Sequence, residues 1–290
     1  MAKFRGVAIT ADDVEEYLAT QDDFALELFV YSQARALGLA TTHGGTYEDP
    51  VTKKPRQYDV RAYFAKNNCR IDLAIECKSL RPSYPLLISR IGRIAEESFH
   101  QLVFSYQPMS SHVMTGRGIT PAEVVTVGRG ESIYSIGQYV GKSTAQIGRN
   151  DNGDFISTDS EIYDKWSQAL ASASELLSDA VYHHSKFEMG FCITAVIPIL
   201  VVSDDTLWVA DYSDNGVLQS KPRQVDDALL YVGREYSKPM SISYNVTHLH
   251  VCTKTAVPKL LERITTDQNF WDSVFPEEAI DRVSAKIYSS

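Results

Sequence analysis

Cysteine is scarce in this chain of 290 residues, and its few copies are scattered. The cysteines stand singly inside apolar runs, with no pair at CxxC spacing: Cys69, Cys77, Cys192 and Cys252. Isolated cysteines of this kind are typical of reduced thiols that pack as small apolar side chains in the cytosol. The pattern argues against a disulfide framework and against a cysteine-ligated zinc site.

Long apolar segments are also missing. The first ten residues, MAKFRGVAIT, have no sustained apolar stretch that would act as a signal peptide. The longest apolar run, FCITAVIPILVV, is too short to span a bilayer, which takes about 20 residues. We therefore expect a soluble, cytoplasmic protein that has no membrane partner.

The chain has no overall excess of positive charge, since its net charge is -9. A surface that is acidic on average is not that of a general nucleic-acid-binding protein. Basic residues are nevertheless concentrated locally, because residues 51–93 contain ten Lys and Arg against three acids, a balance of +7. This segment is either a solvated hairpin or a local binding surface for an anionic ligand.

Apolar periodicity and turn residues predict a mixed α/β fold in one domain spanning residues 1–290. Thr10 and Asp13 have the spacing of a capping box for a first helix, and Asp22 or Asp23 caps a second helix that ends at Gly38. Phe24, Leu28 and Tyr31 are expected to form the buried stripe of that second helix, with Glu27 on the same stripe.

Three strand-like runs follow at 39–48, 56–65 and 70–80, joined by short turns, and they predict an antiparallel meander. A helix is expected over 85–106, a surface insertion over about 107–160, and a long helix over 161–184. Further strands are expected at 191–202, 206–213 and 244–253, with two helices in a C-terminal extension over about 213–290. The core would then comprise about 22–106 and 161–212.

The second and third of these strands carry charges at unusual positions. Alternation places Glu76 and Lys78 on one face of the third strand, and Asp59 can face them from the second strand. Two carboxylates this close repel each other unless a cation lies between them, and carboxylate oxygens are ligands that Mg²⁺ prefers. The pattern predicts a Mg²⁺ site between Asp59 and Glu76, with Lys78 beside it.

In this order of elements the chain resembles the PD-(D/E)XK nucleases of the restriction-endonuclease-like fold. The resemblance rests on a helix with an acid, Glu27, on a hairpin that leads to Asp59, and on the sequence IECK, which supplies Glu76 and Lys78. Two departures are Tyr58 in place of the motif proline and Gln57 at a position that is often Glu. The later helix around Trp166 and the strand after it fit the family core more loosely.

The resemblance implies a fold with a central mixed sheet flanked by helices. It also implies the activity of a metal-dependent deoxyribonuclease, which could be an endonuclease or an exonuclease. It implies that Asp59, Glu76 and the backbone carbonyl of Cys77 bind Mg²⁺, for which Mn²⁺ substitutes. It also implies that Lys78 orients the attacking water and that Glu27 assists. The basic residues nearest to this site are expected to bind DNA phosphates: Lys53, Lys54, Arg56, Arg61 and Arg81. The roles in which members of this family occur favour a role in antiviral defence.

Several alternatives stay open at this point. The chain could be a nuclease-fold scaffold or a nucleic-acid-binding subunit without turnover, working as a homo-oligomer or with a partner protein, and RNA could replace DNA as substrate. The Gly-Lys-Ser of GQYVGKSTAQ lacks the glycine spacing of a phosphate-binding loop. His248, His250 and Cys252 alternate along one strand, where a zinc site is conceivable but incomplete.

Overall fold

A computed structural model describes residues 6–21, 23–106, 122–128, 130–187, 190–237 and 242–288. The helices are α1 (Ala11–Gln21), α2 (Phe24–Ala36), α3 (Ser160–Ala180), α4 (Val257–Thr266), α5 (Gln268–Val274) and α6 (Glu277–Tyr288). The strands are β1 (Ala40–Glu48), β2 (Pro55–Lys66), β3 (Cys69–Lys78), β4 (Leu86–Gly92), β5 (His100–Tyr106), β6 (Ala122–Val127), β7 (Tyr139–Arg149), β8 (Phe155–Thr158), β9 (Phe191–Val202), β10 (Leu207–Asp211), β11 (Arg223–Gln224), β12 (Asp227–Ser237) and β13 (Ser243–Thr253).

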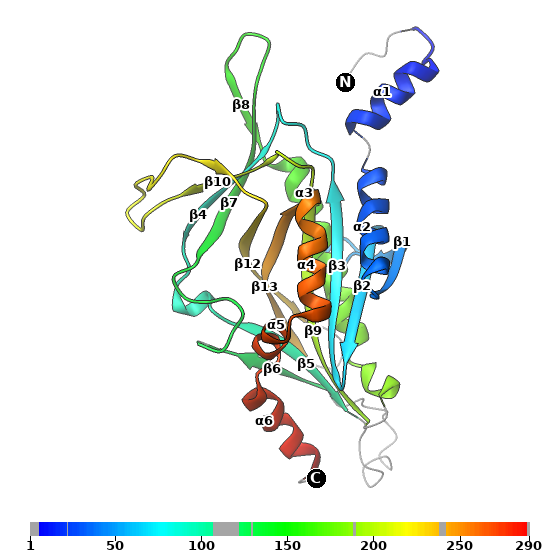
Figure 1. Ribbon diagram of the computed structural model, residues 1–290, viewed down its shortest axis with the longest axis vertical. Coiled ribbons are helices and arrows are strands. Elements are labelled where there is room, and N and C mark those ends of the chain that lie inside the picture. The colour runs from blue at the N-terminus through cyan, green and yellow to red at the C-terminus, as the bar shows by residue number, and fades with distance from the viewer. Residues whose placement is uncertain are drawn as a thin grey trace.

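The described strands form one large mixed sheet with helices against both faces (Figure 1). Its main path runs β1-β2-β3-β9-β13-β12-β7-β4-β10-β11, while β5 pairs with β9 and β6, and β8 pairs with β7. The fold is thus a mixed α/β fold with a central sheet, in agreement with the expected class. Within the described part of the chain, no helix is both long enough and apolar enough to cross a membrane.

The first half of the sheet is built by the segment from α2 to β3 and by β9. The strands β1, β2 and β3 form an antiparallel meander, and β3 then pairs in parallel with β9 along its whole length, from Cys69 opposite Ile193 to Lys78 opposite Val202. A parallel pair needs a crossover, and α3 lies within the segment that provides it. The strand β9 is buried throughout, as expected for an apolar strand covered on both faces.

Two layers of helices pack on opposite faces of β3. Ile71, Leu73, Ile75 and Cys77 belong to a core shared with residues of α2, α4 and α5. Ala74, from the alternate set, packs with Leu170, Ala173 and Leu177 of α3. In the view of Figure 1, α4 lies in front of the strands and α3 behind them. Successive side chains of β3 therefore face α2 and α3 in turn.

The helix ends follow the local sequence. Thr10 and Asp13 form a reciprocal capping box, in which the backbone N–H of Thr10 donates to Asp13 Oδ2 at 2.8 Å and the N–H of Asp13 donates to Thr10 Oγ1 at 3.2 Å. Gly38 follows α2 with φ of 81° and so ends that helix as expected. Asp23 stands at the N-cap position of α2, but its side chain makes no capping hydrogen bond there, and Asp22, the other proposed cap, lies outside the described residues.

The prediction of a helix over 85–106 is wrong. This segment forms β4, a short 3-10 turn at Ala95–Glu97, and β5. The physical reason is the period of its apolar residues, since Leu86 and Ile88 are buried two residues apart and pack against Leu207 and Leu230. Partner strands β7 and β10 satisfy the backbone of β4 on both sides.

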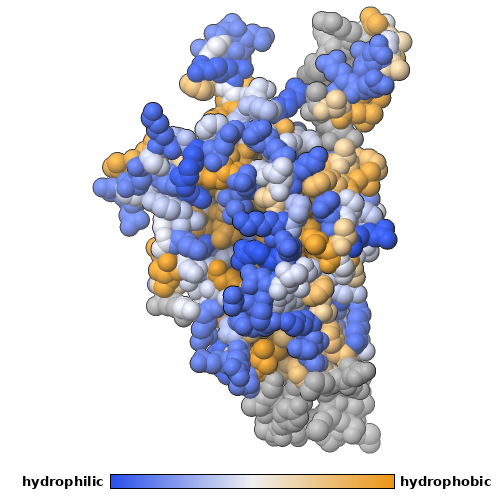
Figure 2. Space-filling view, viewed as in Figure 1, coloured by the Kyte–Doolittle hydropathy of each residue, from blue (hydrophilic) through white to orange (hydrophobic). Residues whose placement is uncertain are grey.

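The predicted buried stripe of α2 is wrong for Phe24 and Leu28, while Tyr31 is partly buried and packs against the core. Phe24 is 52% exposed and Leu28 is 41% exposed, whereas Leu26, Val30 and Ala34 are buried. Apolar residues recur around most of this helix, so periodicity alone does not single out the face that packs on the sheet. Figure 2 shows apolar surface along α2 and on α1, where Val14, Tyr17 and Leu18 are also exposed.

The segment expected as an insertion joins the same sheet where it is described. Residues 107–121 lie outside the described part, but β6 pairs with β5, and β7 lies between β4 and β12. Val140 and Gln146 of β7 are buried. The hairpin of β7 and β8 extends beyond the rest of the sheet at the top of Figure 1, and Phe155 in it is 74% exposed.

Candidate active site

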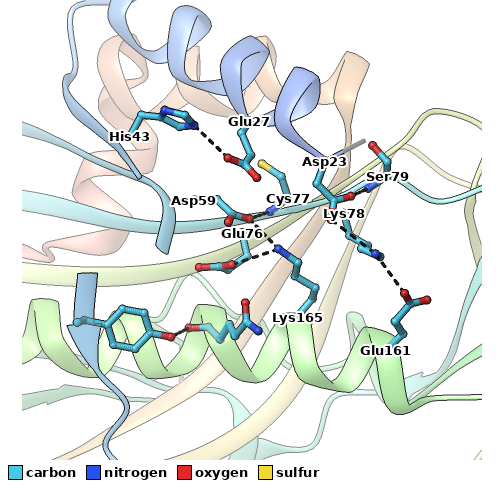
Figure 3. A network of polar contacts seen from close by, with 12 residues as sticks. Asp23, Glu27, His43, Asp59, Glu76, Cys77, Lys78, Ser79, Glu161 and Lys165 are labelled. Atoms are coloured by element: carbon cyan, nitrogen blue, oxygen red, sulfur yellow. Dashed lines mark hydrogen bonds and ion pairs between the residues drawn. The ribbon is translucent and has the colours of Figure 1, made fainter. Parts of the chain in front are cut away.

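Two carboxylates come together where β2 and β3 face α3 (Figure 3). On β3 the even-numbered side chains from Asp72 to Lys78 face this helix, which places Glu76 and Lys78 there. On β2 Val60 and Ala62 pack in the opposite core, so Asp59 is directed away from that core. The antiparallel register pairs Val60 with Ile75, which brings Asp59 beside Glu76.

Asp59 is held at the point where the backbone pairing of β2 and β3 stops. The last paired residues are Val60 and Ile75, and beyond them the backbone N–H of Cys77 donates to Asp59 Oδ2 at 2.8 Å. The side chain of Asp59 thus replaces the missing backbone partner. Since the N–H and C=O of one strand residue point to the same side, the carbonyl of Cys77 is directed toward the same edge.

Glu76 is buried without a hydrogen bond. Its exposed fraction is 0%, and neither Oε1 nor Oε2 has a hydrogen-bond partner among the described residues. Burial and then the charge of Asp59 raise the pKa of Glu76 well above its usual value, while the charge of Lys165 and the backbone N–H of Asp59 act in the opposite direction. A fully buried carboxylate without donors is costly, so this group requires an explanation.

The cation closest to both acids is Lys165, which the sequence interpretation missed. Its Nζ lies 3.1 Å from Asp59 Oδ2 and 3.8 Å from Glu76 Oε2, and its side chain is 18% exposed. Burial alone would lower the pKa of Lys165, but the charges of Asp59 and Glu76 outweigh it and raise the pKa. The ammonium comes from α3, far away in the sequence, so no spacing within the meander indicates it.

Lys78 lies on the same face but is engaged elsewhere. Its Nζ is 3.3 Å from Glu161 Oε1 on α3 and 3.6 Å from Asp23 Oδ2 at the start of α2. Asp23 also accepts the backbone N–H of Ser79 at 2.6 Å. Among the contacts of the described residues, none joins Lys78 to Asp59 or Glu76. The structure therefore brings Asp59 and Glu76 together around Lys165 and leaves Lys78 beside them.

Glu27 reaches the same region from α2. Its Oε2 lies 3.0 Å from His43 Nε2, and the ring of His43 lies between those of Phe24 and Tyr31 at centroid distances of 5.6 Å and 5.7 Å. Burial raises the pKa of Glu27, and the charge of Asp59 adds to the rise. Glu27 is thus close enough to Asp59 to interact with its charge, from the opposite side of β3 to Lys165 (Figure 3).

The basic residues proposed for DNA binding have different surroundings. Arg61 is turned inward, since its Nε donates to Ser172 Oγ at 3.0 Å and its Nη2 lies 3.3 Å from Glu175 Oε2 on α3. On the hairpin, Lys53 lies 3.7 Å from Glu48, and Arg56 lies 3.7 Å from Asp49.

Lys54 and Arg81 are exposed, and no ion pair is found for either among the described residues. About half of the positive charge over residues 51–93 is therefore engaged inside the protein. Four of its arginines make contacts inside the protein: Arg61 with α3, Arg70 with Asp72 at 2.7 Å, Arg90 with Asp211 at 2.7 Å, and Arg93 with His248 at 3.1 Å.

The donors that could hold a divalent ion are the carboxylates of Asp59 and Glu76 and the carbonyl of Cys77. Within the described ranges, no three His, Cys, Asp or Glu side chains form a cluster that could hold a metal ion. The His248–Cys252 strand does not complete a zinc site there, because His248 contacts Arg93 and His250 contacts the hydroxyl of Tyr134 at 3.1 Å. The unpartnered oxygens of Glu76 fit a cation that needs oxygen ligands.

Comparison with known protein families, with curated proteins and with solved structures finds no match for this chain. The chemistry of the site therefore has to be argued from its own geometry. That geometry consists of two adjacent carboxylates, one of them fully buried, with two lysines and a third acid nearby.

Proposed function

We propose that this chain is a Mg²⁺-dependent nuclease with a restriction-endonuclease-like core, and that it hydrolyses phosphodiester bonds of DNA. Mn²⁺ is expected to substitute for Mg²⁺. The observation that carries the proposal is the pair Asp59 and Glu76, in which a wholly buried carboxylate without hydrogen bonds lies beside a second carboxylate. Such a pair is unfavourable by itself, and a divalent ion bound by both groups relieves it.

The order of elements supports the same proposal. A helix, three antiparallel strands, a second helix and a strand parallel to the third occur in this order as α2, β1, β2, β3, α3 and β9, with β4 to β8 inserted between β3 and α3. The resemblance noted in the sequence implies this order, with one acid on the second strand and one on the third. Fold alone does not define a function, so the argument rests on the site.

Four residues of the site have a part in the proposed reaction. Asp59, Glu76 and the carbonyl of Cys77 would bind Mg²⁺, which when bound supplies positive charge for the developing phosphate charge and acidifies water. Lys78 would orient the attacking water by a hydrogen bond. In the overall reaction the water oxygen joins phosphorus, the bond to the leaving sugar oxygen breaks, and that oxygen takes up a proton.

DNA as the substrate rests on the resemblance and on charge near the site. Lys54 and Arg81 are the exposed cations of the expected set for which no ion pair is found among the described residues, and they would neutralise phosphates near the reacting bond. Arg61 is not part of this proposed contact surface, because α3 binds its guanidinium.

A second function is favoured by one specific observation. Lys165 already compensates Asp59 and Glu76, as it would in a nuclease-fold scaffold that binds nucleic acid without cutting it. The two functions are distinguished by cleavage of supercoiled, linear and single-stranded DNA and of RNA, with Mg²⁺ and with EDTA. Cleavage with Mg²⁺ but not with EDTA supports the nuclease. Binding of nucleic acid without cleavage under both conditions supports the scaffold.

Lys78→Met sharpens this comparison. If Lys78 orients water, the variant should fold and bind DNA as the wild type does but lose at least about a hundredfold in the cleavage rate. Because Lys78 also contacts Asp23 and Glu161, melting of the variant must be measured in parallel. An unchanged rate would exclude Lys78 from the reaction.

A further inference from the structure

Lys165 occupies a distinctive position, because one ammonium contacts both acids of the site. Its Nζ is within hydrogen-bond distance of Asp59 Oδ2, at 3.1 Å, and within ion-pair distance of Glu76 Oε2, at 3.8 Å. Figure 3 shows its side chain rising from α3 toward the space between the two carboxylates. No other Lys or Arg is in ion-pair contact with Glu76 among the described residues.

We propose that Lys165 is an internal counter-ion that occupies the cation position of the site in the metal-free protein, and that a divalent ion must displace its ammonium to bind. This inference rests on the proposed function only in taking the same two carboxylates as the metal ligands. The inference follows from charge. The ammonium and a divalent ion would bind the same carboxylate oxygens, and the positive ammonium repels an incoming cation.

The structure also provides a second position for the displaced ammonium. Lysine has a flexible stem of four carbons, and this side chain remains 18% exposed, so it can turn away without unfolding α3. Asp23, which pairs with Lys78 at the start of α2, lies close enough to interact with the charge of Lys165. The ammonium can therefore move from one acidic group toward another and toward solvent.

The inference is tested by comparing metal binding in the wild type, in Lys165→Met and in Lys142→Met. Lys142 is a matched control, because it is a partly buried lysine that forms an ion pair with a buried acid, Glu97, away from this site. Mn²⁺ binding is followed by electron paramagnetic resonance, and melting is measured in EDTA and in Mg²⁺.

Lys165→Met should bind Mn²⁺ about tenfold or more tightly than the wild type, because nothing competes for the carboxylates. Its melting temperature should fall in EDTA and rise more steeply with Mg²⁺ than that of the wild type. Lys142→Met should bind Mn²⁺ as the wild type does. If Lys165→Met binds Mn²⁺ equally or more weakly, or if neither protein binds it, the inference is wrong.

A second variant and a cleavage assay cover the cases in which Lys165→Met alone would not decide. If Lys165→Met does not fold in EDTA, Lys165→Gln takes its place, since the amide keeps a donor for Asp59 without the charge, and the same tightening is expected. Tighter Mn²⁺ binding with no cleavage of any nucleic acid supports the inference and rejects the nuclease. Cleavage by the wild type with no tightening rejects the inference and leaves the nuclease.

Discussion

Glu76→Gln tests the physical basis of the site, because it removes one charge and keeps the shape of the side chain. In the metal-free protein this charge has no hydrogen bond, and its nearest cation is Lys165 at 3.8 Å. At an effective dielectric constant of 20, attraction at that distance amounts to about 4 kcal/mol before desolvation. Burial and the charge of Asp59 act against this attraction and raise the pKa of Glu76.

The substitution should therefore stabilise the metal-free protein at alkaline pH. Leaving a buried polar group without hydrogen bonds costs about 1–3 kcal/mol and a charged group costs more, and Gln keeps part of that cost because its amide is also unpaired. We expect a gain of about 1 kcal/mol, or roughly 3 °C in the melting temperature for a chain of this size.

The pH dependence gives the sign of this effect. A carboxyl group with a raised folded pKa takes up its proton more readily in the folded state, so folding stability is lost as pH rises from the unfolded pKa through the folded pKa. Glu76→Gln removes that loss. Its advantage over the wild type should be larger at pH 8 than at pH 5.

Asp211→Asn is the matched control with the opposite sign. Asp211 is buried too, but hydrogen bonds from Arg90 and Arg223 outweigh the effect of burial and lower its pKa. Its stabilising contribution is present above the unfolded pKa and is lost as pH falls, so this variant should lose about 2 kcal/mol at pH 8.

Melting and urea unfolding in EDTA at pH 5 and pH 8 measure both variants. If Glu76→Gln is less stable than the wild type at pH 8, or if its effect is the same at both pH values, the reasoning about the buried charge is refuted.

The remaining predictions concern the neighbours of Glu76. Asp59→Asn should destabilise the metal-free protein by about 1–2 kcal/mol in urea unfolding, because Lys165 loses its hydrogen-bonded carboxylate; an unchanged midpoint would contradict this. Arg61→Ala should lose about 1–2 kcal/mol of stability in the same assay and leave the salt dependence of DNA binding unchanged. Arg81→Ala should keep its stability and lower the slope of log affinity for DNA against log salt concentration by about one unit. Mg²⁺ binding below the raised pKa of Glu76 should release protons, so calorimetry in buffers of different ionisation enthalpy should give different heats, and equal heats would show that no proton is released.

Several helix ends and strands could be predicted from the sequence because their signals are local. The capping pair Thr10 and Asp13, the terminating Gly38 and the apolar run of β9 act within a few residues, and the structure has each of them. The alternation of β2 and β3 likewise directs Asp59 and Glu76 to one side, since side-chain direction follows from strand geometry alone.

The rest of the site depends on packing between distant segments. Lys165 reaches Asp59 only because α3 crosses the face of β2 and β3, and no local pattern reports that crossing. Two carboxylates without a cation would repel each other, so Asp59→Asn would stabilise the fold, whereas with the ammonium of Lys165 bound to Asp59 the same substitution removes a favourable contact. Similarly, α2 has apolar residues on several faces, and its partners decide that Val30 is buried and Phe24 exposed.

The most direct test of the central claim is plasmid cleavage by the wild type and by Glu76→Gln at equal concentration of folded protein. The proposed function predicts that the wild type cuts DNA in Mg²⁺ and not in EDTA. It predicts that Glu76→Gln, although folded and at least as stable, does not cut in either. Cleavage by Glu76→Gln at the wild-type rate would contradict the account, and so would a wild type that neither binds Mg²⁺ nor cuts DNA.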